Sequence, residues 1–360
     1  MNRFPASRAA FSLKLAGALA IALAGSGAQA APPAEPAVER QGGDTPVVTW
    51  RARGPVDVLV ADRADAPLRS ARLVSARDGD GKAVIDHAGA ARRYVVLRDV
   101  RSGDMVRVAE RALPLEAGSN FRDIGGYPAA GGRHVRWGLI YRSGATPLLT
   151  QSDRQTIAAL GLKNMIDLRS NEERVLAPTR IDGVPYTAVG YSMTGLMSGL
   201  GTGGGMELLY RRLPETMVPQ LRQVFARLLR NEGPIVYNCS AGQDRTGFVT
   251  AVILSALGTP WPVIVSDYHL STKFRRPEFE MPPLAPAQQA GSAAGAMFAQ
   301  FQSNPNATKA QPLKTAAGVA YLDFAFAELK AKWGGVNGYL AREIGITPRD
   351  TARLRALYTQ

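Results

Sequence analysis

Cysteine is almost absent from this chain, whose 360 residues include only Cys239. An intramolecular disulfide and a zinc site built on cysteine pairs are therefore excluded. The three histidines, His87, His134 and His269, are too scattered to predict a metal cluster. Aromatic residues make up 7% of the chain, and no zinc-finger or ribonucleoprotein spacing occurs. The sequence therefore argues against a nucleic-acid-binding protein.

A long apolar run is also missing. The apolar run at 15–25 covers about 11 residues, whereas a membrane-spanning helix needs roughly 20. Basic residues precede this run, and the small residues at 28–30 follow it, as in a secretory signal peptide. We expect residues 1–30 to be removed on export, which leaves a periplasmic or secreted protein without a stable membrane anchor.

Acidic residues are the minority among the charged ones. The chain has 43 Lys and Arg against 30 Asp and Glu, a formal net charge of +13. Removal of the leader, which holds three basic and no acidic residues, leaves +10. A basic surface suits anionic ligands such as phosphates. The basic residues are spread along the chain, so charge alone does not select a ligand.

The first part of the mature chain has the pattern of β structure. Residues 31–45 are rich in Pro, Ala and Gly and predict a flexible linker. Residues 46–114 contain short β-branched runs between Gly, Asp and Pro breaks, which predict a small antiparallel β module of sandwich type. Within it, the stretch at 76–83 (ARDGDGKA) has the composition of a hairpin turn.

Strands and helices alternate in residues 115–360, which predicts an α/β fold with a mainly parallel sheet flanked by helices. The expected order is helix 151–160, strand 162–168, helix 207–231, strand 234–238 and helix 246–258. A glycine-rich loop covers 195–205, and residues 277–318 predict an insertion or lid with some helix at 288–302. Thr347, Pro348 and Asp350 mark the start of the last helix.

The stretch from Cys239 to Arg245, here called the Cys239 loop, carries the strongest chemical signal. It lies between a predicted buried strand and a predicted helix. Small residues let successive backbone amides point inward as an anion-binding nest, and the helix dipole adds to it. The same field favours the thiolate form of a cysteine. The candidate phosphate-binding residues are Ser240, Ala241, Gly242, Gln243, Thr246 and Gly247.

Cys-x5-Arg followed by Thr-Gly resembles the signature of protein tyrosine phosphatases. The form CSAGQDRTG resembles the bacterial tyrosine phosphatase family, which also includes lipid and dual-specificity members. Shorter blocks of that family recur in order at 120–127 (NFRDIGGY), 141–144 (YRSG), 166–170 (IDLRS), 267–271 (DYHLS) and 345–347 (GIT). The resemblance covers residues 116–358.

The resemblance implies a cysteine-dependent phosphatase with a tyrosine-phosphatase-like fold and no metal or organic cofactor. Its substrate would be a phosphorylated protein or another phosphate ester. Cys239 would attack phosphorus and form a phosphocysteine, while Arg245 and the loop amides hold the phosphoryl oxygens. Asp244 is the first candidate for the general acid, and Asp167 is the second. Asp167 also has a structural reading, as the partner of a loop arginine.

Two further arginines, Arg142 and Arg169, are secondary candidates for contact with substrate anions. Both also have a structural reading as buried or solvated charges, which the sequence favours. The same applies to Lys273.

Two positions depart from the family pattern. Asn238 stands where the family usually has a histidine that orients the loop, so we expect lower activity. Gln243 stands where some members have a lysine linked to phosphoinositide binding, which weakens the case for a lipid substrate.

The sequence is compatible with several substrates and with two other functions. Phosphotyrosine is the leading substrate because a phenol is a good leaving group; phosphoserine, phosphoinositides and inositol phosphates are the others. A phosphoanion-binding module without turnover would fit Asn238. A sulfur transferase also uses a loop cysteine at a helix start, but the Arg-Thr-Gly continuation argues against it.

Overall fold

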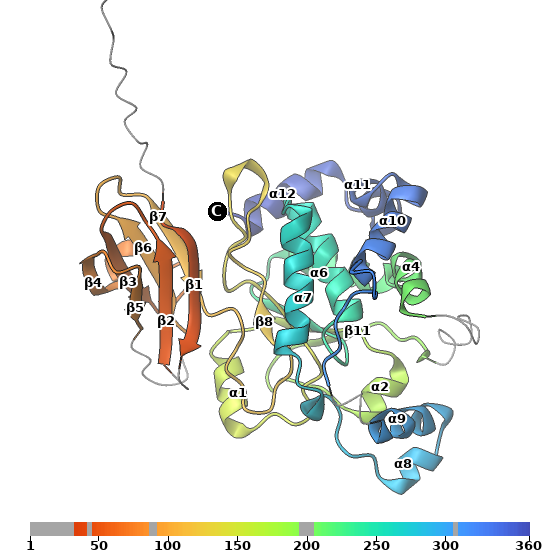
Figure 1. Cartoon of the computed structure of the whole chain (residues 1–360). Helices are drawn as coiled ribbons and strands as arrows, with labels where there is room; N and C mark the ends of the chain where they lie inside the picture. Colours follow the sequence, from red (N-terminus) through yellow and green to blue (C-terminus); the bar gives the residue numbers. More distant parts are fainter. Residues whose placement is uncertain (1–31, 42–44, 86–91, 194–204, 305–308) are drawn as a thin grey trace, which may run out of the picture.

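The computed structural model describes residues 32–41, 45–85, 92–193, 205–304 and 309–360. The expected leader at 1–30 lies outside the described residues, as does most of the glycine-rich loop. Two parts lie side by side: a β-rich part near the N-terminus and a larger part of helices and strands (Figure 1). Among the described residues, no helix is both long and apolar enough to cross a membrane.

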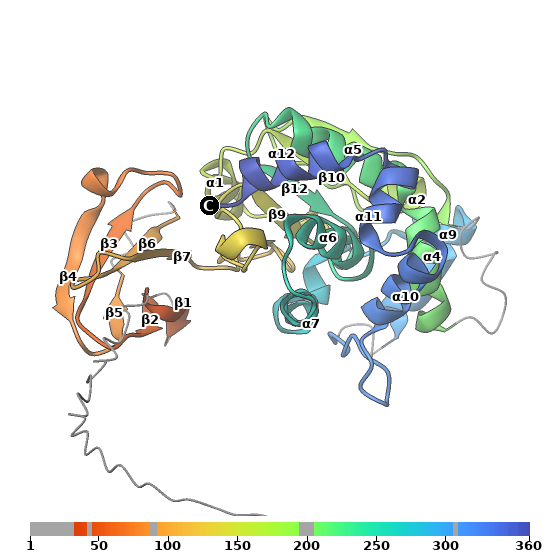
Figure 2. The same ribbon diagram turned by 90° about the horizontal axis from the view of Figure 1, so that it is seen from above.

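The N-terminal part consists of two antiparallel sheets. One has the order β1 (Ala34–Gln41), β2 (Thr45–Arg51), β5 (Lys82–Val84). The other has the order β4 (Arg72–Asp78), β3 (Val56–Ala61), β6 (Tyr94–Asp99), β7 (Met105–Ala109). Figure 2 shows the two sheets facing each other. One core joins them, since Val48 and Trp50 of the first sheet pack with Val58 and Leu97 of the second. The expected antiparallel sandwich is therefore present.

Two predictions for this part are wrong. Part of the predicted linker at 31–45 is strand β1, which pairs with β2. Its Pro36 falls where the register shifts, between Ala34 and Ala37, and proline is tolerated at such irregularities on edge strands. The turn at 76–83 does not close a hairpin either, because β4 pairs with β3 and β5 pairs with β2. It carries the chain from one sheet to the other.

The larger part is built on a five-stranded sheet with the order β11 (Tyr186–Ala188), β10 (Asn164–Asp167), β12 (Ile235–Asn238), β9 (Ile140–Ser143), β8 (Arg122–Asp123). The neighbours from β11 to β9 are parallel, and only β8 is antiparallel. The predicted α/β fold with a mainly parallel sheet is confirmed.

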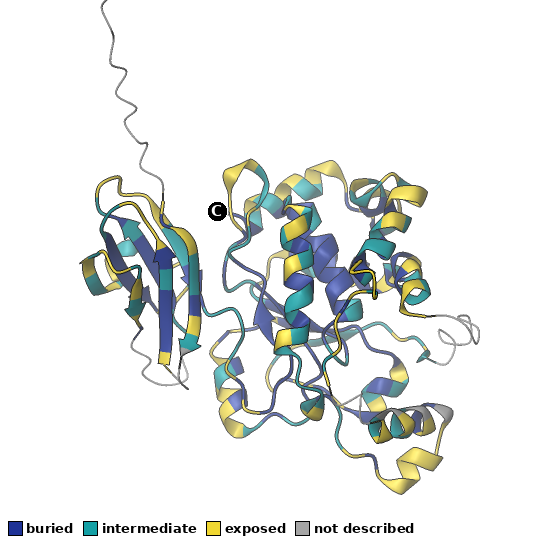
Figure 3. Ribbon diagram, in the orientation of Figure 1, coloured by how far each residue is buried: buried dark blue, intermediate teal, exposed yellow. Residues whose placement is uncertain are grey.

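Helices surround this sheet (Figures 1 and 2). In chain order they are α1 (Gln151–Ala158), α2 (Asn171–Leu176), α4 (Met206–Thr216), α5 (Val218–Arg230), α6 (Asp244–Leu257), α7 (Trp261–Phe274), α8 (Pro286–Ala290), α9 (Ala293–Ser303), α10 (Tyr321–Trp333), α11 (Val336–Tyr339) and α12 (Pro348–Tyr358). Short 3-10 turns occur at Leu68–Ser70, Ala130–Gly132 and Pro277–Phe279, and Leu340–Ile344 is a π-helix. Figure 3 shows α6 buried at the centre, which its nearly continuous apolar sequence explains.

Helix boundaries follow the expected signals with two exceptions. Capping boxes at Thr150 and Thr347 open the helix expected at 151–160 and the last helix. The single helix predicted over 207–231 is two helices, α4 and α5, because Pro219 at the start of α5 lacks an amide and cannot continue the α4 hydrogen-bond ladder. The helix predicted at 288–302 is split into α8 and α9.

The parallel strands place the Cys239 loop. Asp167, Asn238 and Ser143 lie opposite one another at the carboxyl ends of β10, β12 and β9. Ligands bind at this edge of parallel α/β sheets, where the strands are followed by loops and helix N-termini. The Cys239 loop follows β12 directly and leads into α6.

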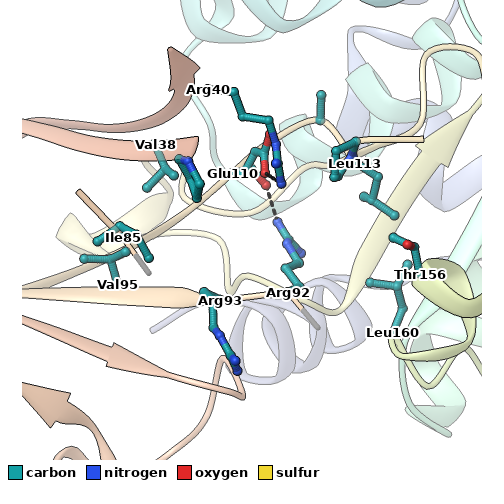
Figure 4. A pocket seen from close by; sticks show the side chains of 13 residues that line it. Val38, Arg40, Ile85, Arg92, Arg93, Val95, Glu110, Leu113, Thr156 and Leu160 are labelled. Carbon is teal, nitrogen blue, oxygen red and sulfur yellow. Dashed lines mark hydrogen bonds and ion pairs between the residues drawn. The ribbon is translucent and has the colours of Figure 1, made fainter. Parts of the chain in front are cut away.

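The β sandwich is joined to the α/β part by shared packing. Trp137 of the α/β part lies in the sandwich core, and its indole N–H donates to the carbonyl of Arg107. Arg92 of the sandwich donates to Asp123 Oδ2 at 2.6 Å and to the carbonyl of Glu110 at 2.7 Å. Figure 4 shows Arg92 pointing toward Glu110. The cavity drawn there has a volume of only about 30 Å³, roughly enough for one or two waters.

Candidate active site

The Cys239 loop is packed tightly against the strand end behind it. Gly242 has a φ of 66°, and a Cβ added there would lie 2.5 Å from the backbone nitrogen of Gly144. Both the backbone conformation and the close approach therefore require glycine at this position. Cys239 itself is only 2% exposed.

Three successive loop carbonyls are held on the outer side of the loop. Ser240 O accepts from the amide of Ala145 at 2.8 Å, and Ala241 O accepts from Asn120 Nδ2 at 3.1 Å. Gly242 O accepts from Asn120 Nδ2 at 2.9 Å and from Arg142 Nη2 at 2.8 Å. In a planar trans peptide the following N–H points the opposite way. The amides of residues 241–243 therefore face inward, as an anion-binding nest requires.

Asn120 is suited to this role by its own backbone. Its φ is 56°, in the left-handed region that asparagine tolerates better than most residues. Its side-chain oxygen accepts a hydrogen bond from Arg122. Asn120 and Arg122 belong to the block at 120–127, so that block supports the loop from behind.

A buried ion cluster lies further behind the loop. Asp267 contacts Arg142 Nη1 at 2.6 Å and Arg122 Nε at 3.2 Å, and it accepts from the Tyr127 hydroxyl at 2.9 Å. All three charged side chains are 1% exposed or less. Burial alone would raise the pKa of Asp267, but the two arginines hold it well below the usual range. Burial and the like charge of Arg142 lower the pKa of Arg122 to about 10. Two cations against one anion leave positive charge behind the nest.

The secondary candidates do not line the cavity in front of the Cys239 loop. Arg142 is fully buried and binds the back of the loop. Arg169 is also fully buried and pairs with Asp167 at 2.7 Å. The hydroxyl of Tyr186 donates to the same carboxylate at 2.8 Å. Asp167 therefore serves as the structural partner of an arginine, and its assignment as second-choice acid is wrong. Lys273 is exposed and pairs with Glu39 of β1 at 3.4 Å.

Arg245 is held by a carboxylate that the sequence reasoning missed. Its Nη1 and Nη2 donate to the two oxygens of Glu173 at 2.7 and 2.6 Å, and its Nη1 also donates to the Tyr191 hydroxyl at 2.5 Å. Ser240 Oγ donates to Glu173 Oε1 at 2.5 Å. Burial would raise the pKa of Glu173, but the charge and hydrogen bonds of Arg245 lower it to about 2. The guanidinium is thereby fixed beside the nest.

A local signal for Glu173 was present in the sequence. Ser170 and Glu173 form a capping box at the start of α2, directly after the block at 166–170. The capping pattern fixes the position of the glutamate. Its pairing with Arg245, 72 residues further along the chain, is set by the tertiary fold.

Asp244 is the first residue of α6 and faces the cavity in front of the loop. Its Oδ1 accepts from the Tyr210 hydroxyl at 2.5 Å. The cavity has a volume of about 670 Å³, and Cys239, Asp244 and Arg245 all line it. The loop thus brings the three predicted catalytic side chains to one space.

The predicted insertion at 277–318 supplies the opposite wall of that cavity, with Met281, Pro283 and Phe298. Arg275, just before it, pairs with Glu280 at 2.9 Å and donates to Gln243 Oε1 at 3.2 Å. The site therefore has an apolar wall opposite an anion-binding floor.

Three further residues singled out in the sequence lie just before or just after the loop. Thr246 is buried in the first turn of α6. Gly247 packs on Tyr268, whose ring lies 2.9 Å from where a Cβ would be, so its role is close helix packing. Asn238 is fully buried; its Nδ2 lies 3.5 Å from Cys239 O, and its Oδ1 has no hydrogen-bond partner among the described residues.

Comparison with known proteins matches this arrangement. A sequence model described as the tyrosine phosphatase family matches residues 113–360. A Cupriavidus necator protein provisionally named a tyrosine-protein phosphatase is 30% identical over 257 residues, covering 68% of this chain and 88% of that protein. A tyrosine-protein phosphatase of Nostoc commune is 27% identical over 222 residues, covering 58% and 69%. The crystal structure of Pseudomonas aeruginosa TpbA aligns at 14% identity with a TM-score of 0.26, covering 38% and 71%.

The chain belongs to the bacterial tyrosine phosphatase family. It is therefore a cysteine-dependent phosphatase that hydrolyses phosphate esters, which agrees with a buried cysteine in a loop whose amides form an anion-binding nest.

Proposed function

We propose that the chain is a protein tyrosine phosphatase in which Cys239 is the nucleophile. The supporting observation is that Cys239, Asp244 and Arg245 line one cavity at the inward-facing amides of the loop. An aryl phosphate seated there has its phosphoryl oxygens at the amides and Arg245, and its ring against the apolar wall. Two of its relatives are named as tyrosine-protein phosphatases.

The reaction runs in two steps. In the first, Cys239 Sγ forms a bond to phosphorus as the bond to the leaving oxygen breaks, and Asp244 gives that oxygen its proton. In the second, Asp244 takes a proton from water, which attacks phosphorus and displaces the thiolate. Arg245 and the loop amides stabilise the charge on the three equatorial oxygens in both steps. A thiolate and a protonated acid are required together, so the rate rises and then falls with pH.

The test is phosphate release from phenyl phosphate by residues 31–360, at pH values from about 4 to 8, in reducing buffer with chelator. Cys239→Ser is the matched variant, because it replaces only sulfur by oxygen. We expect turnover in the wild type, none in the variant, and vanadate binding in both. Turnover retained in Cys239→Ser would contradict the mechanism. Absence of turnover in both, with vanadate still bound, would favour a phosphoanion-binding module.

Substrate choice is tested with peptides that differ only in the phosphorylated residue. We expect kcat/KM to be higher for a phosphotyrosine peptide than for the phosphoserine peptide, because the phenol leaves more easily and its ring reaches the apolar wall. The reverse order would remove phosphotyrosine as the substrate class.

We also propose that the protein is exported, on the basis of the leader at residues 1–30. When the full chain is expressed in a bacterium, the N-terminus of the protein in the periplasmic fraction should be Ala31. An intact leader on cytoplasmic protein would contradict export.

A further inference from the structure

A chain of buried hydroxyl groups leads to Asp244 from outside the Cys239 loop. The Tyr268 hydroxyl donates to the Tyr210 hydroxyl at 2.6 Å, and the Tyr210 hydroxyl donates to Asp244 Oδ1 at 2.5 Å. Tyr210 comes from α4 and Tyr268 from α7, so two helices converge on the first residue of α6. Asp244 is therefore held by a side chain that no sequence block identifies.

The Tyr210 ring is fixed as well as its hydroxyl. Tyr210 is fully buried, stacks on Tyr321 with ring centroids 5.7 Å apart, and meets Tyr268 edge to face at 6.1 Å. A ring fixed on two sides places its hydroxyl in one position. Burial is the largest cause that raises the pKa of Tyr210 well above its ordinary value, and the neighbouring charge of Asp244 is the second. Tyr210 therefore remains a proton donor throughout the working pH range.

The direction of the chain determines which carboxyl oxygen carries the proton. The Tyr210 hydroxyl accepts from Tyr268, so its own proton is directed at Oδ1 of Asp244. A protonated Oδ1 would be a weaker acceptor for this donor than the carbonyl oxygen of the acid form. The proton of the acid form is therefore placed on Oδ2, the oxygen that Tyr210 leaves free.

We propose that Tyr210 is the positioning residue for the general acid: it holds Oδ1 of Asp244 and leaves Oδ2 to protonate the leaving oxygen. The inference rests on the role of Asp244 in the proposed function. Tyr210 touches neither the phosphoryl group nor the leaving group in this account. It acts by fixing the carboxyl plane toward the cavity as the phosphorus–oxygen bond breaks.

Other charged and titratable groups also face Asp244, and they stay in place when the Tyr210 hydroxyl is removed. They are Cys239 and Arg245 in the loop, Tyr268 on α7, and Arg275, Glu278 and Glu280 in the segment that follows α7. A pH effect of Tyr210→Phe is therefore assigned to the lost hydroxyl alone.

The experiment compares kcat/KM for two esters, phenyl phosphate with a poor leaving group and p-nitrophenyl phosphate with a good one. Tyr210→Phe keeps the ring and removes the hydroxyl. We expect a loss of about tenfold for phenyl phosphate, the effect of one charge-assisted hydrogen bond, and a much smaller loss for the nitrophenyl ester. The falling limb of the pH profile should move to higher pH, because the carboxylate has lost a donor that favoured its ionised form.

Two comparisons separate the possible failures. Tyr321→Phe removes a hydroxyl from the same aromatic cluster and should behave like wild type. If Tyr210→Phe matches Tyr321→Phe, or lowers both esters equally without moving the limb, the positioning role is wrong. Asp244→Asn should slow phenyl phosphate far more than the nitrophenyl ester, and adding Tyr210→Phe to it should cost nothing further. If Asp244→Asn slows both esters equally, the proposed role of Asp244 itself is wrong.

Discussion

The outer and inner sides of the Cys239 loop are built from different kinds of contact. On the outer side, Arg122, Arg142 and Asp267 are buried almost completely and touch only protein. On the inner side, Arg245 is 14% exposed and lines a cavity large enough for a substrate. Arginine is paired with a carboxylate on both sides, but only the inner side can exchange a protein partner for a ligand.

This difference separates the residues that hold the conformation of the loop from those that act on the phosphoryl group. Residues of the outer side turn the loop carbonyls away, so their loss should cost folding free energy and activity together. Residues of the inner side act on the phosphoryl group, so their loss should cost activity with a smaller effect on folding.

The largest effect on folding is expected for Asp267→Asn. The change leaves two buried guanidinium groups without their anion, which costs about 3–5 kcal/mol of unfolding free energy. Urea unfolding at neutral pH measures it. The control is Asp182→Asn, since Asp182 is 83% exposed and lies 3.9 Å from Arg154. Equal stability of the two variants would refute the scaffold role of the cluster.

A smaller loss, about 3 kcal/mol, is expected for Arg92→Met. Asp123 is fully buried in the α/β part, and Arg92 of the sandwich supplies its counter-charge. The loss should appear in the unfolding of the catalytic part, which is measured as the loss of activity on heating. Arg63→Met, in an exposed pair with Asp65, is the control in the same sandwich. If Arg92→Met melts like this control, the sandwich does not stabilise the catalytic part.

An intermediate, pH-dependent effect is expected for Glu173→Gln. The pKa of Glu173 is about 2 in the folded protein, against an ordinary value of 4.5. A depressed folded-state pKa contributes stability above the unfolded value, and this contribution is lost as pH falls from about 4.5 toward 2.

Glu173→Gln should therefore be about 2 kcal/mol less stable than wild type at neutral pH, and the two stabilities should converge in acid. Urea midpoints across this range check it, with the exposed Glu232→Gln as control. Arg245 also loses its orienting partner. The fall in kcat, expressed as a free energy, should therefore exceed the fall in the free energy of unfolding. A difference that persists unchanged near pH 2 would show that the ion pair is not its source.

The smallest effect is expected at Asn238. Its amide contact with Cys239 O is long, at 3.5 Å, so Asn238→Ala should change turnover little. Asn238→His places an imidazole beside the thiol, and its protonated form favours the thiolate. The rising limb of kcat/KM should move to lower pH in Asn238→His and stay in place in Asn238→Ala. An unchanged limb in the histidine variant would mean that this position does not control the thiol.

The sequence was sufficient to predict the three catalytic candidates on the inner side of the loop. Cys239, Asp244 and Arg245 belong to one short stretch of the chain, so the strand, loop and helix that carry them also bring them together. The parallel sheet followed from the alternation of apolar strands with helices. These features depend on short-range patterns that the order of residues contains.

The outer side could not be predicted in the same way. The sequence shows that Arg142 is charged, but whether it faces substrate or protein depends on Asp267, which lies 125 residues further along the chain. The inner-side residues Asp244 and Arg245 likewise have partners that were missed: Tyr210 and Glu173 lie 34 and 72 residues away from them, and no local pattern encodes those pairings. Strand β1 was missed because its stability comes from β2 and not from its own composition.

The central claim is that catalysis proceeds through a phosphocysteine at Cys239. The most direct test is to quench the enzyme in denaturant during turnover of an aryl phosphate and to map the phosphorylated peptide by mass spectrometry. The mechanism predicts one phosphoryl group, on the peptide that contains Cys239, and none in Cys239→Ser. Turnover with the phosphoryl group on another residue, or the same turnover in Cys239→Ser, would contradict it.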